Sequence, residues 1–147
     1  MSMVDVTAKP EVYREAKAKG TIKLRPETIR LIREGKIEKG DPFQVAKVAG
    51  ILAAKNTSSL IPLCHPLPLT NVEVNLKIMD DSAVGVEATV KTRAQTGVEM
   101  EALVAATVAL LTVWDMTKQY EKDRLGQYSH TVIQDICVVR KVKEEGK

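Results

Sequence analysis

Aromatic side chains are scarce in this sequence, which has one Trp, one Phe and three Tyr in 147 residues. Proteins that hold single-stranded nucleic acid stack bases on aromatic rings, so no nucleic-acid partner is expected. Histidine and cysteine occur twice each, and there is no Cys-x-x-Cys, so no structural metal site is expected. The glycines form neither GxxxxGK nor GxGxxG, so neither of these phosphate-binding loops is predicted.

The sequence also lacks a clear membrane segment. The apolar helical pattern is uncharged only over residues 102–114, roughly 20 Å of helix, whereas a span takes ~20 apolar residues. This pattern predicts a core helix. Two cysteines, Cys64 and Cys137, and no signal peptide point to free thiols in the cytoplasm.

The length of 147 residues and the ordinary composition predict one domain over 1–147. Its core is expected to cover about 5–141, with frayed ends at 1–4 and 141–147. The net charge of +3 says little about partners by itself.

Alternating apolar and polar residues predict strands over 20–25, 72–78, 84–90 and 131–140. The recurrence of Arg14, Ala16 and Ala18 at a spacing of two allows the first strand to begin earlier. A helix over 11–19 is the competing interpretation.

Helix signals separate these strands. Pro26 begins one helix, which ends at Gly35, and Asp41 caps another that runs to about Lys55. Prolines hold residues 58–69 extended, and a long helix covers 96–118 before a polar loop at 123–129. The order strand, helices, strand, strand, helix, strand predicts an α+β, ferredoxin-like split βαβ fold, an antiparallel sheet with helices on one face.

Asp115 is the first candidate for chemistry. It follows the apolar run directly, beside Trp114, and opposes the helix dipole, while Lys118 lies one turn later. A surface ion pair is the plain interpretation. Partial desolvation, which would tune the carboxylate for proton transfer, is the alternative.

Residues 61–66, IPLCHP, hold the second candidate. His65 precedes a proline, so its ring projects from a stiff backbone as a possible acid–base group. A loop histidine with one structural hydrogen bond is the alternative, and Cys64 is expected to pack rather than attack.

Basic residues form a third group. Four of them converging on one pocket would suit a triphosphate, although each alone is expected to be solvated. They are Arg14, Lys39, Lys55 and Lys118.

Glu99 and Glu101 open the long helix, where the dipole favours them and where they could present carboxylates to a polar heterocycle. Glu99 and Asp115 lie sixteen residues apart, hence roughly 24 Å along a continuous helix. One small substrate cannot contact both Glu99 and Asp115 of the same chain. If both ends of the helix take part in the reaction, the site must combine two subunits of an oligomer.

Several motifs resemble one family. They are Asp5-Val6, Arg14, KGD at 39–41, Ala49-Gly50, Lys55-x-Thr57, IPLCHP at 61–66, TGVEMEAL at 96–103 and DMTK at 115–118. Together they are similar to cyclic pyranopterin monophosphate synthase, the MoaC family of molybdenum cofactor biosynthesis. The resemblance covers about residues 5–123. Thr117 departs from the Cys of many members, and the C-terminus lacks their Gly-rich tail.

The resemblance implies a ferredoxin-like subunit in a hexamer, a trimer of dimers, with sites between subunits. It implies a lyase that converts 3',8-cyclo-7,8-dihydroguanosine triphosphate to cyclic pyranopterin monophosphate and pyrophosphate. The resemblance implies no cofactor, although a divalent cation can accompany the triphosphate. The alternatives are a zinc-dependent pterin cyclohydrolase, for which the ligands are lacking, and a ferredoxin-like regulator that binds RNA or nucleotides.

The resemblance also assigns roles. Asp115 is its catalytic acid–base and Lys118 the partner, with His65 and Lys55 as further catalytic groups. Leu63, Cys64, His65, Met100 and Glu101 match the substrate contacts. Arg14, Lys39 and Glu99 fall at further active-site positions.

Overall fold

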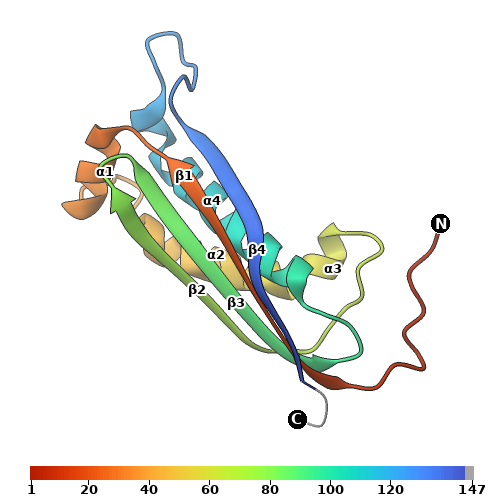
Figure 1. Ribbon diagram of the computed structural model, residues 1–147. Helices are drawn as coiled ribbons and strands as arrows, with labels where there is room; N and C mark the ends of the chain where they lie inside the picture. Colours follow the sequence, from red (N-terminus) through yellow and green to blue (C-terminus); the bar gives the residue numbers. More distant parts are fainter. Residues whose placement is uncertain (145–147) are drawn as a thin grey trace.

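A four-stranded antiparallel sheet is the frame of the molecule, in a computed structural model that describes residues 1–144. Its strands lie in the order β2-β3-β1-β4. They are β1 (Val12–Lys23), β2 (Leu69–Asp80), β3 (Ala83–Ala94) and β4 (Val132–Glu144). Two strands, β1 and β2, are separated by β3, which is antiparallel to both. This is the predicted split βαβ plan (Figure 1).

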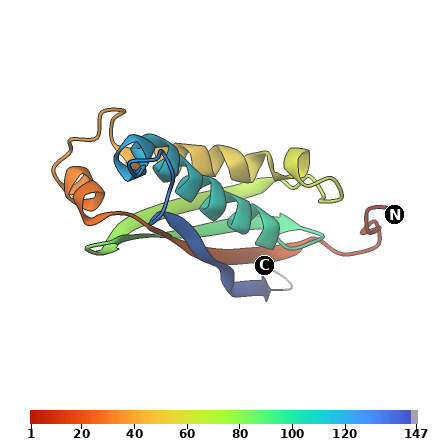
Figure 2. The same ribbon diagram turned by 90° about the horizontal axis from the view of Figure 1, so that it is seen from above.

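Within residues 1–144, four helices accompany the sheet. They are α1 (Pro26–Arg33), α2 (Pro42–Lys55), α3 (Thr57–Leu60) and α4 (Glu99–Glu121). Figure 2 shows α2 and α4 together on one face of the sheet, as predicted. The side chain of Asp41 caps α2 by accepting from the backbone N–H of Phe43 and Gln44.

One cluster of buried apolar side chains fills the space between the helices and the sheet. It is rich in alanine and valine, which lets the helices approach closely. At Gly50 of α2, a Cβ would lie 3.0 Å from the carbonyl oxygen of Ala105 in α4. A larger residue there would push α2 away from α4.

Several sequence expectations need correction. The competing helix over 11–19 is wrong, because these residues belong to β1, whose central position buries Ala16 and Ala18. Each observed strand is longer than the alternating segment from which it was predicted. A short helix, α3, lies in the segment expected to be extended, since Pro62 comes only after its end.

The chain ends also differ from expectation. Residues 141–144, expected to fray, continue β4 and pair with β1, while residues 145–147 lie outside the described part. Met1–Val4 adopts no regular structure. By length and composition α4 is able to cross a membrane, contrary to the estimate from residues 102–114 alone. Half of its apolar window is buried inside the molecule, however, so α4 is a core helix, as predicted.

Candidate active site

Asp115 lies between two lysines near the end of α4. Lys118 Nζ is 3.2 Å from Asp115 Oδ1, and Lys39 Nζ, from the turn before α2, is 3.2 Å from Oδ2. Lys39 Nζ also donates to the Asp115 carbonyl oxygen at 3.1 Å. Because α2 packs beside α4, the turn at Lys39 meets the end of α4, and three predicted site residues come together.

The Asp115 carboxylate is exposed to solvent rather than desolvated. Its side chain is 59% exposed, and hydrogen bonds from Lys39 and then Lys118 hold its pKa below the ordinary value. Within one chain, therefore, Asp115 is an ionised carboxylate held by two cations. The plain interpretation from the sequence, a surface ion pair, describes the single chain, and the hydrogen bonds from the two lysines outweigh the slight desolvation of Asp115.

A shallow apolar cavity of about 340 Å³ adjoins this cluster. Leu111, Trp114 and Ile133 line it together with Asp115 and Lys118. The Trp114 ring packs edge-on against Tyr128, with centroids 5.2 Å apart. Such a surface suits a flat heterocycle beside the charged groups. Ile133 was missed, because only the packing of β4 places it here.

The opposite end of α4 carries a second cluster. Cys64 Sγ lies 3.8 Å from Glu101 Oε2, which brings the loop after α3 against the first turn of α4. Glu101 is only 3% exposed, and burial raises its pKa above the ordinary value. Burial, followed by the charge of Glu101, also raises the pKa of the Cys64 thiol. Cys64 is thus a poor nucleophile here, as expected from the sequence.

Three neighbours complete the surroundings of this pair. The His65 ring donates from Nε2 to the carbonyl oxygen of Val4 at 2.7 Å, so the N-terminal segment lies against it. Leu63 and Met100, which directly precede Cys64 and Glu101 in the sequence, are exposed large apolar side chains. Their exposure leaves them accessible to a ligand or to a partner.

The remaining predicted residues differ in accessibility. Arg14 is buried, and its guanidinium donates to the carbonyl oxygens of Ala94 and Gln95. Glu99 is paired with Lys141 at 3.7 Å. Lys55, at the exposed end of α2, makes no side-chain hydrogen bond or ion pair within residues 1–144.

The two clusters do not meet within the chain. Glu99 and Asp115 belong to the single uninterrupted helix α4, as predicted, so roughly 24 Å separates them. We call the groups around Lys39, Asp115 and Lys118 the lysine–aspartate cluster. The groups around Cys64, His65 and Glu101 are the histidine–glutamate cluster.

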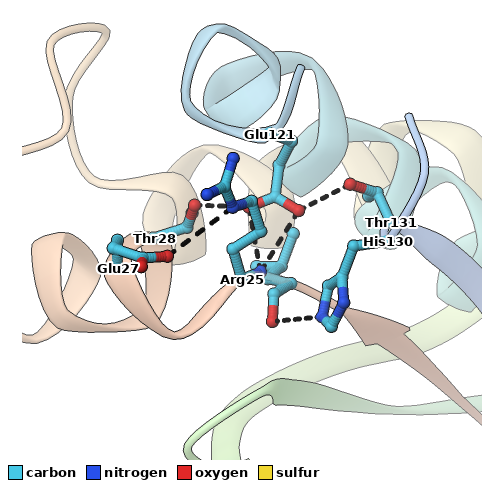
Figure 3. Close-up of polar contacts among 7 residues, drawn as sticks. Arg25, Glu27, Thr28, Glu121, His130 and Thr131 are labelled. Atoms are coloured by element: carbon cyan, nitrogen blue, oxygen red, sulfur yellow. Dashed lines mark hydrogen bonds and ion pairs between the residues drawn. The ribbon is translucent and has the colours of Figure 1, made fainter. Parts of the chain in front are cut away.

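Sequence reasoning missed the buried carboxylate of Glu121 at the end of α4. It accepts hydrogen bonds from the backbone N–H of Arg25 and from the hydroxyls of Thr28 and Thr131 (Figure 3). These contacts join α4 to the start of α1 and to β4. No local signal identifies Glu121, since its partners lie up to 96 residues away.

No group of three or more His, Cys, Asp or Glu side chains within residues 1–144 is arranged to hold a metal ion. Thr117, which departs from the cysteine of the motif, is fully buried, and its hydroxyl donates to the Val113 carbonyl at 2.8 Å. It therefore faces the core rather than the lysine–aspartate cluster.

Comparison with known proteins agrees with these motifs. The model of the MoaC family matches residues 3–144. A Pyrococcus furiosus protein named "Probable cyclic pyranopterin monophosphate synthase" is 56% identical over 99% of this chain and 92% of its own length. A protein of the same name from Saccharolobus solfataricus is 54% identical, covering 97% of this chain and 95% of its own length. This chain therefore belongs to the MoaC family.

Proposed function

We propose that this protein is a cyclic pyranopterin monophosphate synthase of molybdenum cofactor biosynthesis. The observation that carries the proposal is identity of 54–57% along nearly the whole chain to synthases of that name. The sequence motifs IPLCHP, TGVEMEAL and DMTK lie in the two clusters described above. The substrate is 3',8-cyclo-7,8-dihydroguanosine triphosphate, and the products are cyclic pyranopterin monophosphate and pyrophosphate.

The acid–base work is assigned to Asp115, His65 and Lys118. Opening and reclosing the purine-derived ring moves protons, which an ionised Asp and a His can accept and a Lys can return. Lys39 and Lys118 also hold the carboxylate in place. A second subunit covering Asp115 would remove water from it and raise its pKa toward the range useful for proton transfer.

Phosphate chemistry is assigned to the cations. Lys55 is the best candidate, since its exposed ammonium has no partner within residues 1–144 and lies at the end of α2 that adjoins the histidine–glutamate cluster. Lys39 adds charge at the other cluster. Arg14 acts indirectly, because its guanidinium is occupied by backbone carbonyls, and so it positions the end of β3.

Glu101, Glu99, Met100, Leu63 and Cys64 are proposed to contact the pterin. A buried carboxyl with a raised pKa retains its proton longer and can donate a hydrogen bond to a ring nitrogen or carbonyl. A divalent cation accompanying the triphosphate is compatible with this scheme and would be bound through the phosphates.

We further propose that one active site combines the lysine–aspartate cluster of one subunit with the histidine–glutamate cluster of another. The separation of roughly 24 Å within a chain supports this. So does the outer face of α2, where Val45, Val48 and Leu52 lie exposed on one stripe. The stripe runs between the two clusters, so a second copy packed antiparallel across it would bring unlike clusters together at both ends.

A hexamer, built as a trimer of such dimers, is the proposed assembly, and the cytoplasm is the proposed compartment. Each subunit is proposed to be one domain, consistent with its single buried cluster.

A direct assay tests the activity. The purified protein is incubated with the cyclo-GTP intermediate, and pterin and pyrophosphate are measured. A synthase yields both in equal amounts. A ferredoxin-like regulator would bind the nucleotide and return it unchanged, and a cyclohydrolase would act on GTP itself.

A further inference from the structure

A basic cavity lies apart from both clusters, between the start of α1 and the loop joining α4 to β4. Its volume is about 520 Å³. Basic and hydroxyl side chains dominate its lining, from Arg25, Lys122, Arg124, Ser129 and His130. Glu27 and Asp123 are the acidic residues in the lining.

The two acidic residues are already engaged. Glu27 Oε2 is 3.6 Å from Arg25 Nε, and Asp123 Oδ1 accepts from the backbone N–H groups of Leu125 and Gln127 at 2.9 Å each. By contrast, the side chains of Lys122 and Arg124 make no hydrogen bond or ion pair with any residue in 1–144. The lining therefore holds the cations Arg25, Lys122 and Arg124 against the carboxylates of Glu27 and Asp123, which leaves a net positive charge.

The walls of the cavity are fixed before any ligand binds. Glu121 ties the Arg25 backbone and the Thr28 hydroxyl on one wall to the Thr131 hydroxyl on the other (Figure 3). The His130 ring donates from Nε2 to the Leu24 carbonyl oxygen at 3.1 Å, which holds the ring against the end of β1. Little ordering entropy would be lost when a ligand binds such a preformed site.

The cavity also lies close to the lysine–aspartate cluster. Lys122 follows Lys118 by four residues, so the two side chains are neighbours on one face at the end of α4. Asp115 lies seven residues before Lys122, roughly 10 Å along the helix axis.

We propose that this cavity binds pyrophosphate. Lys122 supplies a point charge, and Arg124 and Arg25 supply planar guanidinium donors to the phosphate oxygens. The choice of pyrophosphate among phosphate anions rests on the proposed function, whose reaction releases it near Asp115. Retention of this product would make the enzyme sensitive to pyrophosphate concentration.

Calorimetric titration of the full chain with sodium pyrophosphate tests the proposal. The double variant Lys122→Ala/Arg124→Ala removes two exposed cations, while Lys9→Ala/Lys77→Ala removes the same charge elsewhere. Binding should weaken at least about tenfold in the first variant, as expected for loss of charge-assisted hydrogen bonds. In the control variant, the affinity for pyrophosphate should change less than about twofold, because distant surface charges are largely screened by salt.

Equal weakening in both double variants, or no binding to wild type, would overturn the proposal. Sulfate that competes as well as pyrophosphate at the same concentration would also overturn it, because the cavity would then select charge alone. Conversion of the cyclo-GTP intermediate is measured separately, so a failed pyrophosphate titration leaves the proposed synthase activity standing.

Discussion

At the scale of single residues, Asp115 is the group whose ionisation matters most. We predict that Asp115→Asn leaves the protein folded but lowers turnover by a factor of about 10² or more, because the amide keeps the shape and loses proton transfer. Circular dichroism and steady-state turnover at saturating substrate are the measurements. Activity within a few fold of wild type would reduce Asp115 to a helix-end ion pair with Lys39 and Lys118.

Glu101 gives a prediction in pH. Because its folded pKa is raised above the ordinary 4.5, the folded state keeps the proton longer than the unfolded state. This contribution to stability is present below the ordinary pKa and is lost as pH rises through the folded value. Denaturant unfolding from pH 4 upward should show a fall in wild type that is absent in Glu101→Gln. If the free energy of unfolding of both proteins falls in parallel with pH, Glu101 is not the source of the fall.

Glu121 is predicted to be structural rather than reactive. Glu121→Ala leaves a backbone N–H and two hydroxyls without their acceptor, which should lower the free energy of unfolding by about 2–4 kcal/mol. Glu27→Ala, an exposed acid on the neighbouring turn, serves as the control and should change it by less than about 0.5 kcal/mol. Equal effects of the two substitutions would contradict the prediction.

At the scale of elements, the outer stripe of α2 is predicted to be a subunit interface. Val48→Asp places a charge in the middle of that stripe, so it should yield smaller assemblies and little activity while the subunit remains folded. Leu125→Asp, at an exposed loop tip, is the control. Sedimentation velocity gives the assembly size. Unchanged assembly of the Val48 variant would leave the stripe without a partner.

Local sequence patterns predicted most elements but not their extents. Alternation identified all four strands, and Asp41 with Pro42 fixed the start of α2. Strand ends were missed, because pairing with neighbours, rather than local composition, extends β2 to Leu69 and β4 to Glu144. The lysine–aspartate pairing of Lys39 with Asp115 was not foreseeable from spacing, since 76 residues separate them.

The burial of the candidate site residues was harder to predict than which residues they are. Asp115 and Glu101 are both candidate site residues of one helix, yet Asp115 lies exposed and Glu101 buried. Position along an almost wholly apolar helix does not reveal which face packs on the sheet. Glu121 carried no signal because its partners are assembled only by the fold.

At the scale of the whole molecule, the length of α4 links the sequence to the assembly. The helix α4 is continuous, and its ends carry different halves of the proposed site. A chain with both halves but no way to join them requires a second copy. The fold thus predicts cooperation between subunits from the length of one helix.

Subunit mixing tests this claim most directly. Glu101→Gln and Asp115→Asn proteins, each first confirmed to be inactive alone, are mixed in equal amounts under conditions that allow exchange, and conversion of cyclo-GTP is measured. Sites built from two chains should restore about a quarter of wild-type activity, because one site in four then pairs two intact halves. No recovery, with exchange confirmed by mass spectrometry, would contradict the shared site.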